Sequence, residues 1–191
     1  MEGTLKTGSV LRGSFCDQSG GRPVLSVAKF LPSQGDRCQE VPAKDEIAIT
    51  RRASELRIGP RVLAVLRDVP CHQAYAKSGE VLRGGARGGA RCDVLLMEDI
   101  EAGGEYQRAD AALRRIPSNA ERMAIAARVA KADEALRSNA GVSHGQLHGK
   151  AGLRKVFVSR NGDVRLIDFG RATRDAPTAT PYDVFRLMTA F

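Results

Sequence analysis

Residues 156–170 read VFVSRNGDVRLIDFG, and this stretch decides the fold. Apolar and β-branched residues stand on both sides of Asn161-Gly162, a dipeptide that favours the tight turn of a β-hairpin. The second strand then runs into Asp168-Phe169-Gly170. A carboxylate at the end of a strand, followed by a flexible glycine, is well placed to coordinate Mg²⁺ on a nucleotide. The stretch therefore predicts a hairpin that carries a metal-binding aspartate.

The first half of the chain predicts an antiparallel sheet. Residues 24–30 are apolar and β-branched, and we expect them to pair with residues 10–15 across a glycine-containing loop. Residues 61–66 and 92–97 are two further strand candidates. Between them, residues 83–91 read RGGARGGAR, a basic loop in which seven of nine residues are Gly or Arg.

One helix is predicted between these strands. Ile49, Ala53 and Leu56 recur at helical spacing until Gly59-Pro60 ends the run. Glu46 lies three residues before Ile49, on the same inward stripe. A carboxylate in that position needs a partner.

After Glu98, the sequence pattern changes from strand-like to helical. Residues 118–121, SNAE, fit a capping box, and one apolar face follows it until Gly141 ends the helix. The order of elements is therefore strands, helix, strands, long helix, hairpin and a short tail. This order predicts an α+β fold, with a sheet-rich lobe over residues 1–98 and a connector with a helical lobe over residues 99–191.

Several short motifs of this chain occur in the order found in protein kinases. Val27-Ala28-Lys29-Phe30 resembles the strand that carries the phosphate-binding lysine of that family, and Glu46 is placed like its ion-pair partner. Residues 94–99, VLLMED, resemble the hinge that meets adenine, and residues 136–170 resemble the catalytic loop and the metal-binding segment. The resemblance implies a two-lobed protein-kinase-like fold. Its N-lobe would be an antiparallel sheet with one helix, and its C-lobe a truncated helical domain.

The resemblance also implies ATP and Mg²⁺ as cofactors. Lys29 would hold the phosphates, Glu46 would orient Lys29, and Asp168 would hold the metal. At the family's glycine-rich loop, two of three glycines are present and Leu5 replaces the middle one. The implied cofactor-binding residues are Gly3, Gly8, Lys29, Glu46, Glu98 and Asp168, and the implied metal ligand is Asp168.

The catalytic loop departs from the family pattern, in which a His-x-Asp supplies the base and an Asn five residues later supplies a second metal ligand. Counting back from Asp168 without gaps aligns His148-Gly149-Lys150 with this pattern and puts Lys155 at the Asn position. Aligning His144-Gly145-Gln146 instead needs a four-residue insertion and puts Ala151 there. Neither alignment retains the base, and Lys155 would repel the metal. Loss of a positioned base costs about 10² to 10⁴ in rate, so we expect impaired or absent phosphoryl transfer.

Three functions remain open from the sequence. The first, which we favour, is a kinase-like domain that binds ATP without efficient transfer. The second is an active atypical kinase or small-molecule phosphotransferase with an unusual base, because Lys29 and Asp168 are retained. The short chain between Asp168 and Asp183 resembles such compact enzymes more than regulated protein kinases, since it leaves no platform for a peptide substrate. The third is an RNA- or polyanion-binding module that uses residues 83–91.

Composition and hydropathy limit the cellular compartment and the binding partners that we expect for the protein. The 191 residues have a net charge of +8, and 42% of them are hydrophobic, which excludes global disorder. No apolar run is long enough for a transmembrane helix, and residues 1–6 lack the apolar core of a signal peptide. We therefore expect an intracellular protein, cytoplasmic or nuclear, with no membrane and with a nucleotide as its partner. A protein partner is a further option, and nucleic acid is not favoured. Four cysteines are expected to be free thiols: Cys16, Cys38, Cys71 and Cys92.

Overall fold

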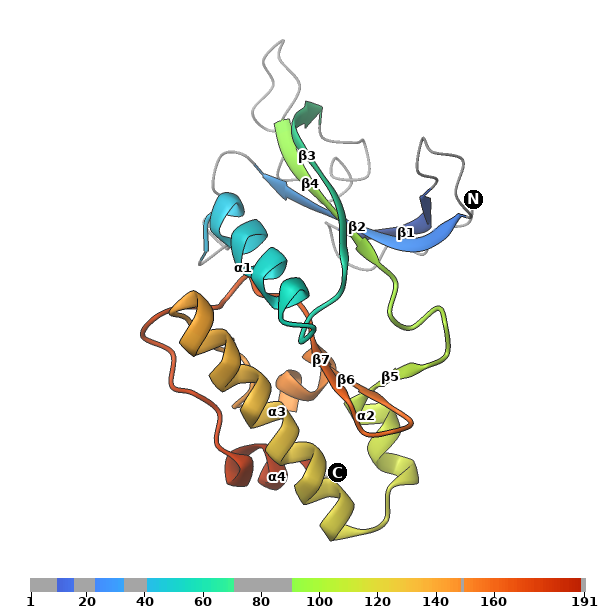
Figure 1. The fold of residues 1–191 in the computed structure, drawn as a ribbon, viewed down its shortest axis with the longest axis vertical. Helices are drawn as coiled ribbons and strands as arrows, with labels where there is room; N and C mark the ends of the chain where they lie inside the picture. Colours follow the sequence, from blue (N-terminus) through green and yellow to red (C-terminus); the bar gives the residue numbers. More distant parts are fainter. Residues whose placement is uncertain (1–9, 16–22, 33–40, 71–90, 149, 190–191) are drawn as a thin grey trace. The chain divides into compact units, whose positions relative to one another are not determined.

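The computed structural model describes residues 10–15, 23–32, 41–70, 91–148 and 150–189 (Figure 1). The chain is α+β, as predicted. Its elements in order are β1 (Val10–Phe15), β2 (Val24–Pro32), α1 (Ala43–Glu55), β3 (Val62–Pro70), β4 (Arg91–Glu98), β5 (Tyr106–Arg108), α2 (Ala109–Ala112), the 3₁₀ helix η3 (Leu113–Arg115), α3 (Asn119–Ala140), the 3₁₀ helix η4 (Lys150–Lys155), β6 (Val156–Ser159), β7 (Val164–Leu166) and α4 (Pro181–Thr189). They form two compact units. The first comprises residues 1–39 and 62–99, and the second comprises residues 40–61 and 100–191.

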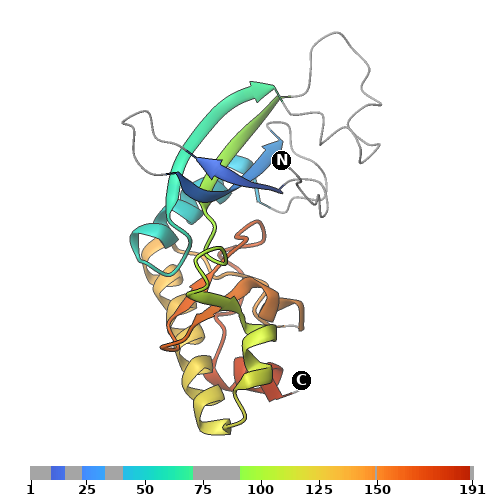
Figure 2. The ribbon, with the colours of Figure 1, turned by 90° about the vertical axis from the view of Figure 1, so that its right-hand side faces the viewer.

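The first unit is built on a four-stranded antiparallel sheet with the strand order β1-β2-β4-β3, which can be followed in Figure 2. All four strands predicted from the sequence are present. Leu31 and Leu95 are fully buried on the two central strands. Lys29 lies on β2, opposite Val10 of β1 and Leu95 of β4.

Cys92 corrects one prediction. It is fully buried on β4 and is disulfide-bonded, so the expectation of a free thiol is wrong for this residue. The other three cysteines, Cys16, Cys38 and Cys71, lie outside the described residues. The wide spacing of the cysteines did not reveal the bond, because a disulfide depends on strand register and on side-chain distance rather than on separation along the chain.

The second unit contains the predicted hairpin. β6 and β7 pair antiparallel, and β5 adds to the other edge of β6. Gly162 has a φ of 79°, the left-handed conformation that the turn needs and that glycine adopts without strain. The backbone N–H of Ser159 donates to the carbonyl of Asp163 at 2.8 Å and closes the turn. The prediction from Asn161-Gly162 is confirmed.

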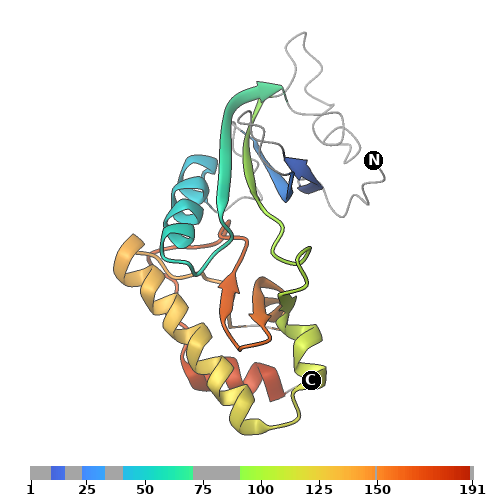
Figure 3. The ribbon, with the colours of Figure 1, turned by 45° about the vertical axis from the view of Figure 1, so that its right-hand side comes forward.

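Helix α3 forms one side of the core of the second unit (Figure 3). Ser118 caps it, accepting a hydrogen bond from the N–H of Glu121, and Gly141 ends it with a φ of 69°. The predicted apolar face is buried: Ile125, Val129, Ala132 and Leu136. Burial of each larger side chain stabilises the unit by about 1.5 to 3 kcal/mol. Neither α3 nor any other helix in the described ranges combines the length and hydropathy needed to span a bilayer.

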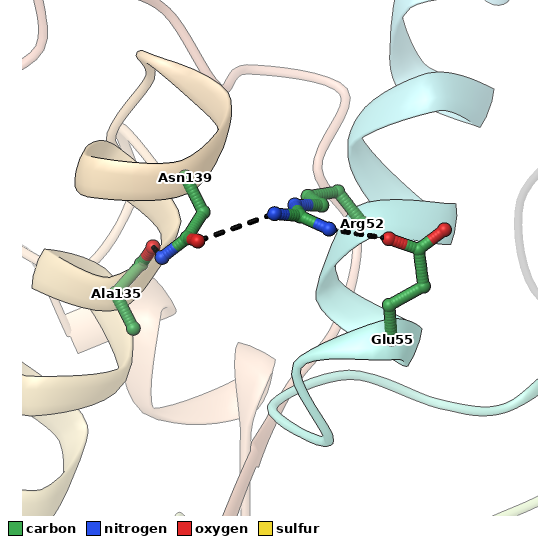
Figure 4. Close-up of polar contacts among 4 residues, drawn as sticks. All are labelled: Arg52, Glu55, Ala135 and Asn139. Carbon is green, nitrogen blue, oxygen red and sulfur yellow. Dashed lines mark hydrogen bonds and ion pairs between the residues drawn. The ribbon is translucent and has the colours of Figure 1, made fainter.

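Helix α1 packs within the second unit. Its side chains Ile49 and Ala53 join the same buried core as α3. Arg52 donates to the side chain of Asn139 on α3 at 3.2 Å and pairs with Glu55 at 2.7 Å (Figure 4). The chain after the helix is tied to β7, because the N–H of Leu166 donates to the carbonyl of Ile58 at 2.7 Å.

Candidate functional site

Asp168 lies two residues after the end of β7 and has a left-handed backbone with a φ of 64°. Asp adopts this conformation more readily than most residues, although it is uncommon outside glycine. On one side, the N–H of Ile167 donates to the carbonyl of Lys155 at 2.9 Å. On the other side, Phe169 is anchored in the core with 1% exposure. The backbone of Asp168 is therefore anchored on both sides.

Lys155 is the residue that contacts this carboxylate. It ends η4, and its ammonium donates to Oδ2 of Asp168 in a hydrogen-bonded ion pair. The two side chains are partly exposed, at 26% for Lys155 and 33% for Asp168. The ungapped alignment put Lys155 at the position of the family's metal-binding Asn. The structure thus holds an ammonium directly on the carboxylate that the resemblance assigns to the metal.

Glu46 comes close to Asp168 within the second unit. Its side chain extends from α1 and is 1% exposed. A methyl group on the α-carbon of Gly170 would lie 3.2 Å from Oε2 of Glu46 and 3.7 Å from Oδ1 of Asp168. The two carboxylates therefore flank Gly170, less than 7 Å apart. Two residues chosen from the sequence for one nucleotide site are thus brought together.

The other predicted site residues belong to the first unit, begin η4, or lie outside the described ranges. Lys29, on β2, and Glu98, at the end of β4 opposite Ser26, belong to the first unit. Lys150 begins η4. Gly3 and Gly8 lie outside the described residues, as does the basic loop except for its last residue. That residue, Arg91, pairs with Asp68 at 2.6 Å.

His144 supports the backbone beside the ion pair. Its Nε2 lies 2.8 Å from the carbonyl of Ile167, and because a carbonyl only accepts, Nε2 must carry the hydrogen. The ring is fully buried and contacts Phe169 with ring centres 5.2 Å apart. Burial lowers the pKa of His144 below 6.5 and outweighs the carboxylates of Asp133 and Asp168, which act in the opposite direction. His144 is therefore a neutral, structural side chain.

Asp133 is a residue that the sequence interpretation missed. It lies on α3 with 1% exposure, and one carboxylate oxygen accepts from the N–H of His144 at 2.7 Å. The other oxygen accepts from the N–H of Ala179 at 2.8 Å. Helical periodicity in the sequence could have predicted that Asp133 is buried. It falls four residues after Val129 and three before Leu136, on the buried face of the helix. A carboxylate on that face requires partners.

Further hydrogen bonds hold the segment after Gly170. Ser143 and Thr173 exchange backbone hydrogen bonds of 3.0 and 3.1 Å. Arg137 donates to the carbonyl of Ala176 at 3.1 Å, and the ring of His148 lies 2.9 Å from the carbonyl of Pro177. Together with Asp133, these contacts fix residues 173–179 against α3 and the loop before η4.

The buried His144 predicts a pH-dependent stability. Because its pKa is lower in the folded protein than in the unfolded chain, the unfolded chain binds more protons below pH 6.5. The contribution of His144 is thus present above that pH and is lost as the pH falls through the folded pKa. We expect the free energy of unfolding to decrease between pH 7 and pH 5 in denaturant titrations.

Two variants separate His144 from other groups. His144→Gln removes the titrating ring and retains a donor for Ile167, so it is expected to flatten this part of the profile. His148→Gln is the matched control, because the His148 ring is exposed. An unchanged slope in His144→Gln would contradict the assignment.

We compared the sequence with protein families and with curated proteins. No protein family matches the sequence, and a search of curated proteins found no match. The function must therefore be inferred from the residues themselves. That inference rests on Glu46 and Asp168 beside Gly170, and on Lys155, which is paired with Asp168.

Proposed function

We propose that this protein is a kinase-like domain that binds ATP and in which phosphoryl transfer is impaired or absent. The observation that carries the proposal is the meeting of Glu46 and Asp168 at Gly170, since these residues come from elements far apart in the sequence. In kinases, the equivalent Glu orients the phosphate-binding lysine, and the equivalent Asp follows a strand and faces the phosphates. A chance match of three letters would not bring the two carboxylates together.

The same elements support the two-lobed assignment. The antiparallel sheet of the first unit carries Lys29, and the next helix along the chain carries Glu46. The second unit is mainly helical and places a hairpin immediately before Asp168. This is the order of a kinase-like N-lobe followed by a truncated C-lobe.

Impaired transfer follows from the loop before β6. Residues 143–155 contain no Asp or Glu that could accept a proton from a substrate hydroxyl. His144 is buried, and its Nε2 is engaged with Ile167, so it is not a substitute base. Loss of a positioned base corresponds to a rate lower by about 10² to 10⁴. ATP binding does not depend on that base.

The decisive test is ATP binding by wild type and Lys29→Met. Saturation at about 100 times Kd should stabilise the wild type by about 2.7 kcal/mol in a thermal shift assay. Lys29→Met removes a cation that would face the phosphates, and we expect it to weaken binding about tenfold or more, as loss of one partner of a desolvated charge pair does.

Lys131→Met is the matched control for this test. Lys131 is an exposed lysine on α3, so its removal changes the net charge equally without touching the proposed site. Its affinity for ATP should equal that of the wild type. Equal weakening in both variants, or no stabilisation of the wild type by ATP, would rule out the nucleotide assignment.

The other two functions gain no comparable support. Arg91, the only described residue of the 83–91 loop, is already paired with Asp68. An active phosphotransferase would need a base from outside residues 143–155. Both stay predictions from the sequence.

A further inference from the structure

We infer that Lys155 is a built-in cation that takes the place of Mg²⁺, so that the protein binds the polyphosphate of a nucleotide without a divalent metal. The inference rests on the proposed function, because it specifies the form in which the nucleotide is bound. It starts from the ion pair between the ammonium of Lys155 and the carboxylate of Asp168.

The ion pair is held by the core of the second unit. The carbonyl of Lys155 accepts from the N–H of Ile167, so the backbones on either side of the pair are joined at 2.9 Å. Leu153 and Val156, on each side of Lys155, are both 1% exposed. η4 also packs closely on the preceding loop, because a methyl group at Gly152 would lie 2.4 Å from the carbonyl oxygen of Gln146. Lys155 is therefore placed by packed neighbours, unlike a lysine on a mobile surface turn.

The residues around Asp168 do not fit Mg²⁺. This metal takes an octahedral set of oxygen ligands and is usually held by one or two carboxylates together with phosphates. The Asp168 carboxylate is already engaged by the Lys155 ammonium. A divalent ion on the Asp168 carboxylate would also lie a few ångström from the Lys155 ammonium, where like charges repel strongly. Binding of Mg²⁺ would have to displace Lys155.

Lys155 supplies what a polyphosphate needs from a cation. An ammonium has three N–H donors, and the bond to Oδ2 of Asp168 uses one of them. The side chain remains 26% exposed, so phosphate oxygens have access to it. A lysine ammonium is an established phosphate ligand in the form of a point charge. Asp168 then orients Lys155 and does not itself hold a metal.

The experiment is a calorimetric titration of ATP in excess EDTA and again in excess MgCl₂. Wild type should bind ATP with similar affinity in the two solutions, within about twofold. Lys155→Asn removes the charge and introduces an amide oxygen, a ligand that suits Mg²⁺. We expect this variant to lose affinity in EDTA by about tenfold, the lower end of what a close charge pair contributes. MgCl₂ should restore its binding.

Two further variants keep the result interpretable. Lys155→Arg retains the positive charge and should still bind ATP in EDTA, which shows that a loss in Lys155→Asn is not caused by unfolding. Arg154→Gln is the matched control, because Arg154 is the adjacent residue of η4 and its side chain is 71% exposed. It should behave as wild type in both solutions.

The outcomes separate this inference from the proposed function. Wild-type binding that requires MgCl₂ would overturn the built-in cation and leave the nucleotide-binding proposal intact. Absence of ATP binding by wild type in both solutions would overturn both. Equal behaviour of Lys155→Asn and Arg154→Gln in both solutions would also overturn the inference, since Lys155 would then make no contribution to binding.

Discussion

Asp133→Ala is expected to lower the free energy of unfolding by about 3 kcal/mol, because it leaves two buried backbone N–H groups without an acceptor and each costs about 1 to 3 kcal/mol. The groups belong to His144 and Ala179, which lie on two segments that Asp133 joins. Alanine keeps the helical propensity of α3, so the loss comes from the hydrogen bonds. Denaturant titration followed by circular dichroism measures it.

Two variants define the size of this effect. Asp133→Asn retains one carbonyl oxygen and can satisfy only one of the two N–H groups, so its loss should be intermediate. Glu134→Ala, at the exposed neighbouring position on α3, should change stability by no more than about 0.5 kcal/mol. If Asp133→Ala were as mild as Glu134→Ala, the two hydrogen bonds would not hold the segments together.

Gly145→Ala is expected to have the second-largest effect, a loss of about 3 kcal/mol. Gly145 has a φ of 76°, where a side chain costs about 1 to 2 kcal/mol. The added methyl group would also lie 2.3 Å from the carbonyl oxygen of Arg171, so one of the two backbones must move. Overpacking of this kind adds about 1 to 3 kcal/mol. The free energy of unfolding measures the sum.

Gly141→Ala separates strain from collision. Gly141 has a similar φ of 69°, and among the described residues, apart from its neighbours in the chain, no atom lies within 4 Å of the position of its added methyl group. This variant should lose only the conformational part, about 1 to 2 kcal/mol. Equal losses at the two positions would show that the approach of Arg171 to Gly145 does not constrain the loop.

The elements that local sequence determines were predictable. The hairpin around Gly162 follows from a turn that only a few residue types adopt readily. The buried face of α3, from Ile125 to Leu136, follows from helical periodicity, and the inward position of Glu46 follows from the same periodicity in α1. In each case, the information lies within a short window of the chain.

The contacts that define the candidate site were harder to predict from the sequence. The sequence predicts that Lys155 opposes a metal, but its bond to Asp168 depends on how the backbones of Lys155 and Ile167 come together. The hydrogen bond between Arg52 and Asn139 depends in the same way on packing between segments that are distant in the sequence. The part assigned to Lys29 stays a prediction, and the ATP titrations test it.

The attachment of α1 limits how this protein could be regulated. In protein kinases, activation is commonly controlled by repositioning of the helix that carries the glutamate. Under the proposed function, α1 would take the place of that helix. It shares a buried core with α3, forms a hydrogen bond to α3 through Arg52 and Asn139, and continues into a segment that is hydrogen-bonded to β7. Rotating α1 outward would expose Ile49 and Ala53, which lie in the core of the second unit, so this movement would carry a hydrophobic cost. An on–off signal would have to act through some other part of the chain.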